Sequence, residues 1–239
     1  MKYIFLLLSV LGIAPLAIGQ DIEGVLTEKI KLLDKSYKNT ELQPLANDFE
    51  RIALADATHW LANYYTAYVN VRIADQSSGS TIDSYCDQAE KYLKIAEKAK
   101  GANASEIYAL YAYLYSAKVK VNPMFRGAKY GKMSREYSEK AIKENPNNPR
   151  PYLIRAIGIF FTPKAFGGGP AKAKPFLDKA FEKFDSFTPE TANSPHWGKG
   201  MAEYLVLTAE IIDAAEAYRI GLVEKLVPAE ELMEVAEKT

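Results

Sequence analysis

Cysteine, histidine and net charge are all scarce in this chain, and each shortage excludes a class of function. Among 239 residues there is one cysteine, Cys86, so no disulfide can form within the chain. Lys plus Arg and Asp plus Glu number 30 each, whereas nucleic-acid binding needs a clustered excess of basic side chains. We therefore predict that the fold depends on its hydrophobic core and that the partner is not a nucleic acid.

Catalytic and cofactor motifs are missing as well. The two histidines, His59 and His196, have no companion set of cysteines or carboxylates of the kind that binds zinc. The glycine run 167–170 lacks the Lys-Ser/Thr pair of a phosphate-binding loop, and we interpret it as a turn. No Gly-x-Ser-x-Gly nucleophile motif occurs. We predict no metal, no cofactor and no enzyme activity, and expect helix-capping or surface roles for both histidines.

The first 19 residues have the layout of a secretory signal peptide. Lys2 is followed by an apolar run over residues 3–18, with small residues at Ala17 and Gly19. The run is shorter than a membrane-spanning helix requires, and Pro15 interrupts it. We predict cleavage between Gly19 and Gln20, which leaves 29 basic against 30 acidic residues. The mature chain is then exported to the periplasm or secreted, with no membrane span.

A repeated helical spacing is the most informative feature that is present. In three segments a small residue is followed four positions later by an apolar or small residue and, three positions after that, by an alanine. A fixed-period helix-turn-helix unit indicates stacked helical hairpins. We therefore predict an all-α fold with one helical-repeat domain over residues 20–204. The three segments are Ala89-Leu93-Ala96, Ser134-Ser138-Ala141 and Ala173-Leu177-Ala180.

Apolar periodicity and turn residues place the individual elements. Asp56 is the expected N-cap of the third helix. Segments 122–132 and 162–170, which contain glycine and proline, are expected to be loops, as is 186–195. The predicted helices are 22–37, 41–55, 57–74, 81–100, 105–121, 133–144, 149–161, 171–186 and 196 to at least 204.

Tyrosine is unusually frequent, with 16 residues, and many of them recur at helical spacing. Tyrosine rings fill wide gaps between packed helices while their hydroxyls reach water or a carbonyl. We interpret them as packing residues, with an aromatic ligand groove as the alternative. Cys86 lies on an apolar helical stripe and is interpreted as a buried small residue.

The helix pairs resemble the tetratricopeptide repeat family over about residues 42–204. The three small-residue segments match its second helices, and Pro146 closes the middle copy. The alanines at 96, 141 and 180 are 45 and 39 residues apart. These spacings exceed the family's repeat length of 34 residues, and segments 122–132 and 162–170 account for the additional residues. With its signal and these two segments, the chain is similar to small exported proteins of Bacteroidetes-type bacteria. Tyr152 and Ala156 match first helices, as do Trp197 and Tyr204, whereas Met201 departs from the pattern.

Residues 205–239 resemble a different family, the crotonases, which include enoyl-CoA hydratases and isomerases. The resemblance is carried by LT-x-x-IIDAAEAYRIGLV followed by VPAEELM. Crotonase chemistry depends on a backbone oxyanion hole and acidic residues upstream of this stretch. Residues 20–204 contain no matching positions, so no catalytic residue is assigned. Two hypotheses follow for this segment: it is the product of a chimeric join near residues 204–207, or it is a terminal capping helix for the array.

From these features we predict an exported, non-enzymatic scaffold that binds a protein or peptide on the concave face of its first helices. A crotonase-type acyl-CoA hydratase or isomerase and a purely structural subunit of an envelope assembly are the alternatives. The predicted contact residues are Tyr113 and Arg150 on first helices and Arg126, Tyr130 and Phe166 on the two inserted segments.

Overall fold

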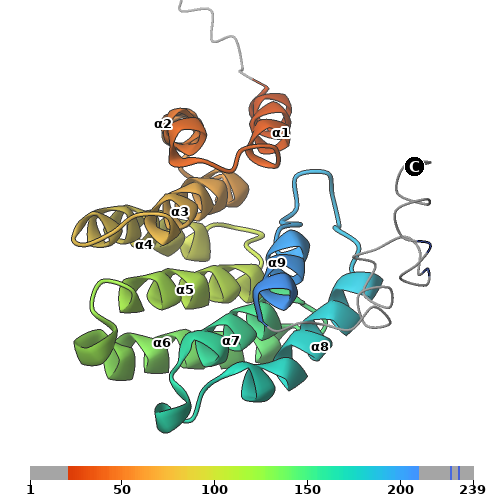
Figure 1. The fold of residues 1–239 in the computed structure, drawn as a ribbon. Coiled ribbons are helices and arrows are strands. Elements are labelled where there is room, and N and C mark those ends of the chain that lie inside the picture. The colour runs from red at the N-terminus through yellow and green to blue at the C-terminus, as the bar shows by residue number, and fades with distance from the viewer. Residues whose placement is uncertain (1–20, 210–226, 228–230, 232–239) are drawn as a thin grey trace, which may run out of the picture.

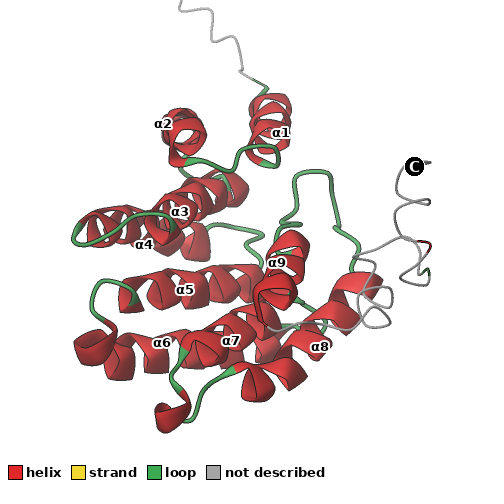
Figure 2. Ribbon diagram, viewed as in Figure 1, coloured by secondary structure: helices red, strands yellow, loops and turns green. Residues whose placement is uncertain are grey.

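The computed structural model of the protein describes residues 21–209, 227 and 231. The predicted signal peptide and most of segment 205–239 lie outside the described residues. Over 21–209 the chain forms nine α-helices and one 3-10 helix, and no strand (Figures 1 and 2). The helices are α1 (Ile22–Leu33), α2 (Asn39–Ala55), α3 (Trp60–Asp75), α4 (Thr81–Lys98), α5 (Ala104–Val119), α6 (Pro123–Glu144), α7 (Arg150–Phe161), η1 (Lys164–Phe166), α8 (Pro170–Ser186) and α9 (Lys199–Ala209).

Neighbouring helices form antiparallel hairpins that stack in one direction. α3 packs on α4, α5 on α6 and α7 on α8, while the first helices α3, α5 and α7 contact one another in turn. Figure 1 shows these pairs layered from α1 and α2 at one end to α7 and α8 at the other. The predicted all-α fold of helical hairpins is therefore confirmed.

The repeated small-residue spacing lies where adjacent helices approach most closely. All nine residues of the three segments are buried, with exposed fractions of 8% or less. Alanine and serine at these positions allow close helix packing, and Ser134 and Ser138 satisfy their hydroxyls by donating to the carbonyls of Ala112 and Ser134. The tyrosines pack as predicted: Tyr111 stacks on Tyr137 with ring centroids 4.8 Å apart.

Segment 122–132 is helical, so the prediction of a loop there was wrong. It forms the first turns of α6, where the Asn122 side chain accepts a hydrogen bond from the Phe125 amide and Pro123 occupies the first turn. Two glycines in a helix cost about 1 kcal/mol each. Tertiary contacts offset that cost, because Arg126 pairs with Asp83 at 2.7 Å and Tyr130 stacks on Tyr115.

The start of α3 also differs from expectation. Asp56 was predicted to cap α3, but its carboxylate accepts from the Thr58 amide. The cap is instead His59, whose Nδ1 accepts from the Ala62 amide at 3.2 Å. The predicted capping role of this histidine is thereby confirmed.

Within residues 21–209, none of the helices combines the length and apolar character that crossing a membrane demands.

Segment 162–170 contains η1 and a turn in which glycine is required. A Cβ at Gly168 would lie 2.1 Å from the Thr162 carbonyl oxygen. The Gly169 amide donates to the carbonyl of Ile159, which ties the turn back to the end of α7. The interpretation of the glycine run as a turn is confirmed.

Residues 187–198, which we call the strap, connect α8 to α9 in an irregular conformation. The ninth helix begins at Lys199, later than the predicted residue 196. Gly198 ends the strap with φ of +116°, and a Cβ there would lie 2.8 Å from a Phe184 ring carbon. Figure 2 shows the strap as a long green loop beside α9 that rises to the level of α1.

Candidate functional site

The strap contacts helices from both ends of the hairpin array. At the α1 end, Asn193 bonds Thr27 at 2.7 Å and Glu23 at 2.7 Å. His196 Nε2 lies 2.9 Å from a carboxylate oxygen of Asp34, the residue that ends α1. These contacts join residues about 165 positions apart in sequence.

Trp197 anchors the strap on the first helices. Its ring stacks on Tyr68 of α3 at 5.0 Å and lies 5.7 Å from the ring of Tyr113 of α5. Its indole N–H donates to the Tyr64 hydroxyl at 2.8 Å. The ring is 8% exposed. The strap therefore covers the aromatic surface of α3 and α5 that the sequence predicted to be a docking face.

A buried ion pair lies beneath the strap. Arg150, at the start of α7, is fully buried and donates from Nη1 to the Glu106 carboxylate of α5 at 2.9 Å. Its Nη2 donates to the Pro195 carbonyl of the strap. The guanidinium also lies over the rings of Phe187 and Trp197, at 4.6 and 5.5 Å. One arginine thus connects α5, α7 and the strap.

Burial dominates the electrostatics of this cluster. Desolvation raises the pKa of Glu106 to about 7, although the charge of Arg150 opposes the rise. A hydrogen bond from the Tyr64 side chain also opposes the rise, and Nε of Arg150 is buried without a hydrogen-bond partner. Burial likewise raises the pKa of Tyr68 to about 12 and that of the Cys86 thiol to about 12. Cys86 is therefore an unreactive core residue, as predicted.

A separate hollow of about 410 Å³ lies between α1 and α2. Its lining combines four apolar side chains with two cations that pair with the same acid. Asp48 pairs with Lys29 at 3.0 Å and also with Arg51, whose side chain is 77% exposed. We call this hollow the α1–α2 groove; its lining residues are Ile22, Val25, Lys29, Asp48, Arg51, Ile52 and Ala55.

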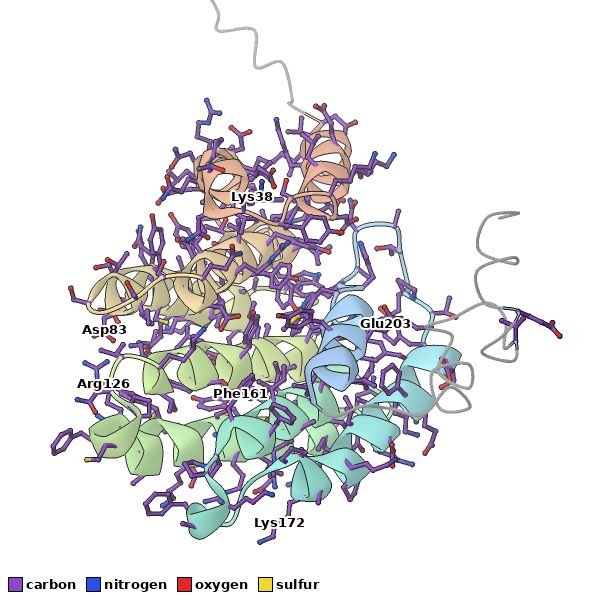
Figure 3. The ribbon with its side chains drawn as sticks, in the orientation of Figure 1. Lys38, Asp83, Arg126, Phe161, Lys172 and Glu203 are labelled. Atoms are coloured by element: carbon purple, nitrogen blue, oxygen red, sulfur yellow. The ribbon has the colours of Figure 1, made fainter. Side chains whose placement is uncertain are left out.

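The five predicted contact residues fall in three different environments. Tyr113 and Arg150 lie together under the strap, with exposed fractions of 5% and 0%. Arg126 and Tyr130 lie on α6, where Arg126 pairs with Asp83 at the edge seen in Figure 3. Phe166 is 82% exposed in η1. The structure thus brings Tyr113 and Arg150 to one surface and leaves the other three outside it.

Sequence reasoning missed the strap and the α1–α2 groove. Only one signal pointed to the strap: a tryptophan next to a histidine and a proline in a segment otherwise rich in serine, threonine and asparagine. Among the described residues, no group of three or more histidine, cysteine or acidic side chains is positioned to hold a metal.

Comparison with known proteins gives one extensive match and one short one. The extensive match is a solved structure, the HusA haemophore from Porphyromonas gingivalis. It is 36% identical, with a TM-score of 0.73, over 88% of this chain and 98% of that one. The short match is a crotonyl-CoA hydratase from Syntrophomonas wolfei, 54% identical over 41 residues. This chain spans only 16% of the hydratase's length. No protein-family model matches the sequence.

The all-helical fold and the match to a haemophore support a helical binding protein. More particularly, the chain belongs to the family of the HusA haemophore. The likeness to crotonases is confirmed only as a short local match. Membership of the tetratricopeptide repeat family stays a prediction, although stacked helical hairpins of that general kind are present.

Proposed function

We propose that this protein is an exported, non-catalytic carrier that binds haem, or a similar planar apolar ring with carboxylates, in the α1–α2 groove. The observation that carries the proposal is the chemistry of the groove, whose lining contains both apolar side chains and a pair of cations. Kinship with a haemophore supports the same ligand class.

The groove matches the two halves of such a ligand. Small-molecule sites usually enclose about 300 to 1,000 Å³ and are mainly apolar with a few polar groups. Val25 and Ile52 provide surface for the ring, which leaves water favourably. Lys29 and Arg51 together outnumber Asp48, with which both pair, and they provide donors for the ligand's carboxylates in charge-assisted hydrogen bonds.

The lining contains no histidine, cysteine, methionine or tyrosine that could ligate the iron of haem. Binding then depends on the ring and its carboxylates. We expect iron-free protoporphyrin to bind about as tightly as haem.

Titration of the purified protein with haem and with protoporphyrin, followed by the Soret band, tests this proposal. Val25→Asp places a negative charge among the apolar lining residues, and Arg51→Glu reverses the sign of one lining charge. Each should weaken binding by about 10- to 100-fold, because a hydrogen bond to a charged group contributes about 1.5–3 kcal/mol. Leu54→Asp and Lys31→Glu change exposed residues of the same helices outside the lining and should bind normally. Equal affinity in all four variants would reject the groove as the site.

A second candidate is the predicted binding of a protein or peptide on the concave face. It is favoured by the strap, an extended segment of the chain that this face already holds through Trp197 and a backbone carbonyl. Under this candidate Tyr113 and Arg150 contact the partner after the strap leaves. Arg126, Tyr130 and Phe166 remain proposed contacts on other surfaces.

A synthetic peptide of residues 187–198 tests the second candidate. We expect it to bind a Trp197→Ala variant, whose own strap lacks the anchor, and not the wild-type protein. The same peptide with alanine in place of its tryptophan is the matched control. Failure of the peptide to bind the variant would remove this candidate.

An acyl-CoA hydratase assay on the full chain tests the crotonase alternative, which is supported only by the short match.

A further inference from the structure

We infer that the strap is a pH-dependent gate over the concave face of the first helices. The strap is closed while the His196 ring is protonated, and it opens when the ring becomes neutral. The contacts that hold the strap lie within the chain itself and are the same whichever ligand occupies the α1–α2 groove.

Both ring nitrogens of His196 face oxygen atoms that can only accept. Nδ1 lies 3.0 Å from the Ser194 carbonyl oxygen, and Nε2 lies 2.9 Å from Oδ2 of Asp34. A neutral imidazole has one N–H and can satisfy one of these acceptors, whereas the imidazolium satisfies both. The geometry of the closed strap therefore selects the protonated ring.

The contacts of His59 are different and provide an internal comparison. Its Nδ1 accepts from the Ala62 amide, so that nitrogen carries no proton, and its Nε2 donates to Glu23 at 2.8 Å. A neutral ring satisfies both contacts. Both histidines tie α1 to the rest of the array, and only His196 requires the charge to do so.

The charged groups around His196 come from several elements. Asp34 of α1 raises the pKa of His196 through its hydrogen bond, while burial and the charge of Arg150 of α7 act against it. Arg72 of α3 donates to the carbonyls of Leu33 and Ser36, beside Asp34. Because the folded pKa lies above the usual value, the closed state gains stability below pH 6.5 and loses it as pH rises through the folded pKa.

Glu106, which lies beneath the strap, is a second group whose protonation favours the closed strap. Arg150 bridges its carboxylate to the strap carbonyl of Pro195, and the strap residue Glu190 adds a repulsive charge. The carboxyl is buried, and desolvation makes its neutral form the less costly one under a closed strap. Closing the strap therefore favours a proton on Glu106 as well as on His196.

Release of this segment would uncover a specific surface. Trp197 would leave the rings of Tyr68 and Tyr113, and Arg150 would lose its strap acceptor. An aromatic surface with a cation at its centre would then face solvent. The gate thus decides whether the concave face can accept a segment from another molecule.

Acrylamide quenching of Trp197 fluorescence between pH 5.5 and 8.5 measures the opening of the strap. The background variant Trp60→Phe removes the other tryptophan of the chain. We expect the quenching constant to rise by about twofold or more with pH, with a midpoint above 6.5, as the local structure opens. Far-UV circular dichroism should stay constant, since the helices do not unfold.

Four further substitutions in the Trp60→Phe background test whether His196 controls the closing of the strap. His196→Gln should give high quenching at every pH, while His59→Gln should keep the transition. Asp34→Asn should shift the midpoint to lower pH, because the carboxylate that favours the imidazolium is gone. Glu106→Gln should remove the contribution of Glu106, so that the remaining change of the quenching constant with pH is due to His196. A flat wild-type profile, or an unchanged transition in both His196→Gln and Asp34→Asn, would overturn the inference.

Discussion

Arg150→Ala is expected to lower the free energy of unfolding by about 3–5 kcal/mol at pH 8. The substitution leaves the buried Glu106 carboxylate without its counter-charge, and breaking one side of a buried pair costs about that much. It also removes the donor to the strap carbonyl of Pro195 and the cation over two aromatic rings. Urea unfolding with linear extrapolation measures the loss.

The size of this loss should depend on pH in a defined direction. Glu106 already has a pKa of about 7, and removal of Arg150 raises it further. At pH 5 the carboxyl is protonated and needs no counter-charge, so the loss should be smaller there than at pH 8. An equal loss at both values would mean that the guanidinium stabilises the fold by packing and not by charge.

Two controls separate the pair from general effects of truncation. Arg135→Ala removes an exposed arginine of α6 and should change stability by no more than about 0.5 kcal/mol. The double variant Glu106→Gln with Arg150→Met replaces the ion pair by neutral side chains. It should recover much of the lost stability, because the orphaned charge is then absent.

Local sequence patterns were sufficient for the hairpins because helix pairing depends on residues close together in the chain. The spacing Ala89-Leu93-Ala96 predicted a closely packed helix, and all three residues are buried. Segment 122–132 shows where such patterns fail. The predicted helix 105–121 ended just before Asn122, and Asn122 and Pro123 begin the next helix instead of a loop. The glycines suggested a loop, but an ion pair with α4 and a ring stack on α5 favour the helix.

The candidate site could be predicted only in part, because its contacts are long-range. Tyr113 and Arg150 were selected as first-helix residues facing the concave side, and they do lie together there. Nothing in their spacing indicated that residues 187–198 would cover them. Contacts such as His196 with Asp34 span 162 positions and have no periodic signature. The α1–α2 groove was not predicted for a different reason: it depends on how two neighbouring helices pack, and apolar periodicity does not specify that geometry.

Trp197→Ala is expected to have the second large effect, about 3–5 kcal/mol, in the range of other buried tryptophan truncations. The ring is stacked on Tyr68, close to Tyr113 and hydrogen-bonded to Tyr64, so its loss leaves a cavity and an unpaired hydroxyl. Trp197→Phe retains most of the ring contact and should lose about 1 kcal/mol, chiefly the hydrogen bond.

The distinctive consequence of Trp197→Ala lies far from the substitution. The strap also holds Asn193 against Thr27 and Glu23, and His196 against Asp34, so release of its anchor weakens the attachment of α1. Hydrogen exchange should therefore accelerate in α1 more than in α4, whose side chains bond to α2, α5 and α6. If exchange accelerated only around the cavity in α3 and α5, Trp197 would be a local core residue. The two ends of the array would then be held in place by their hairpins alone.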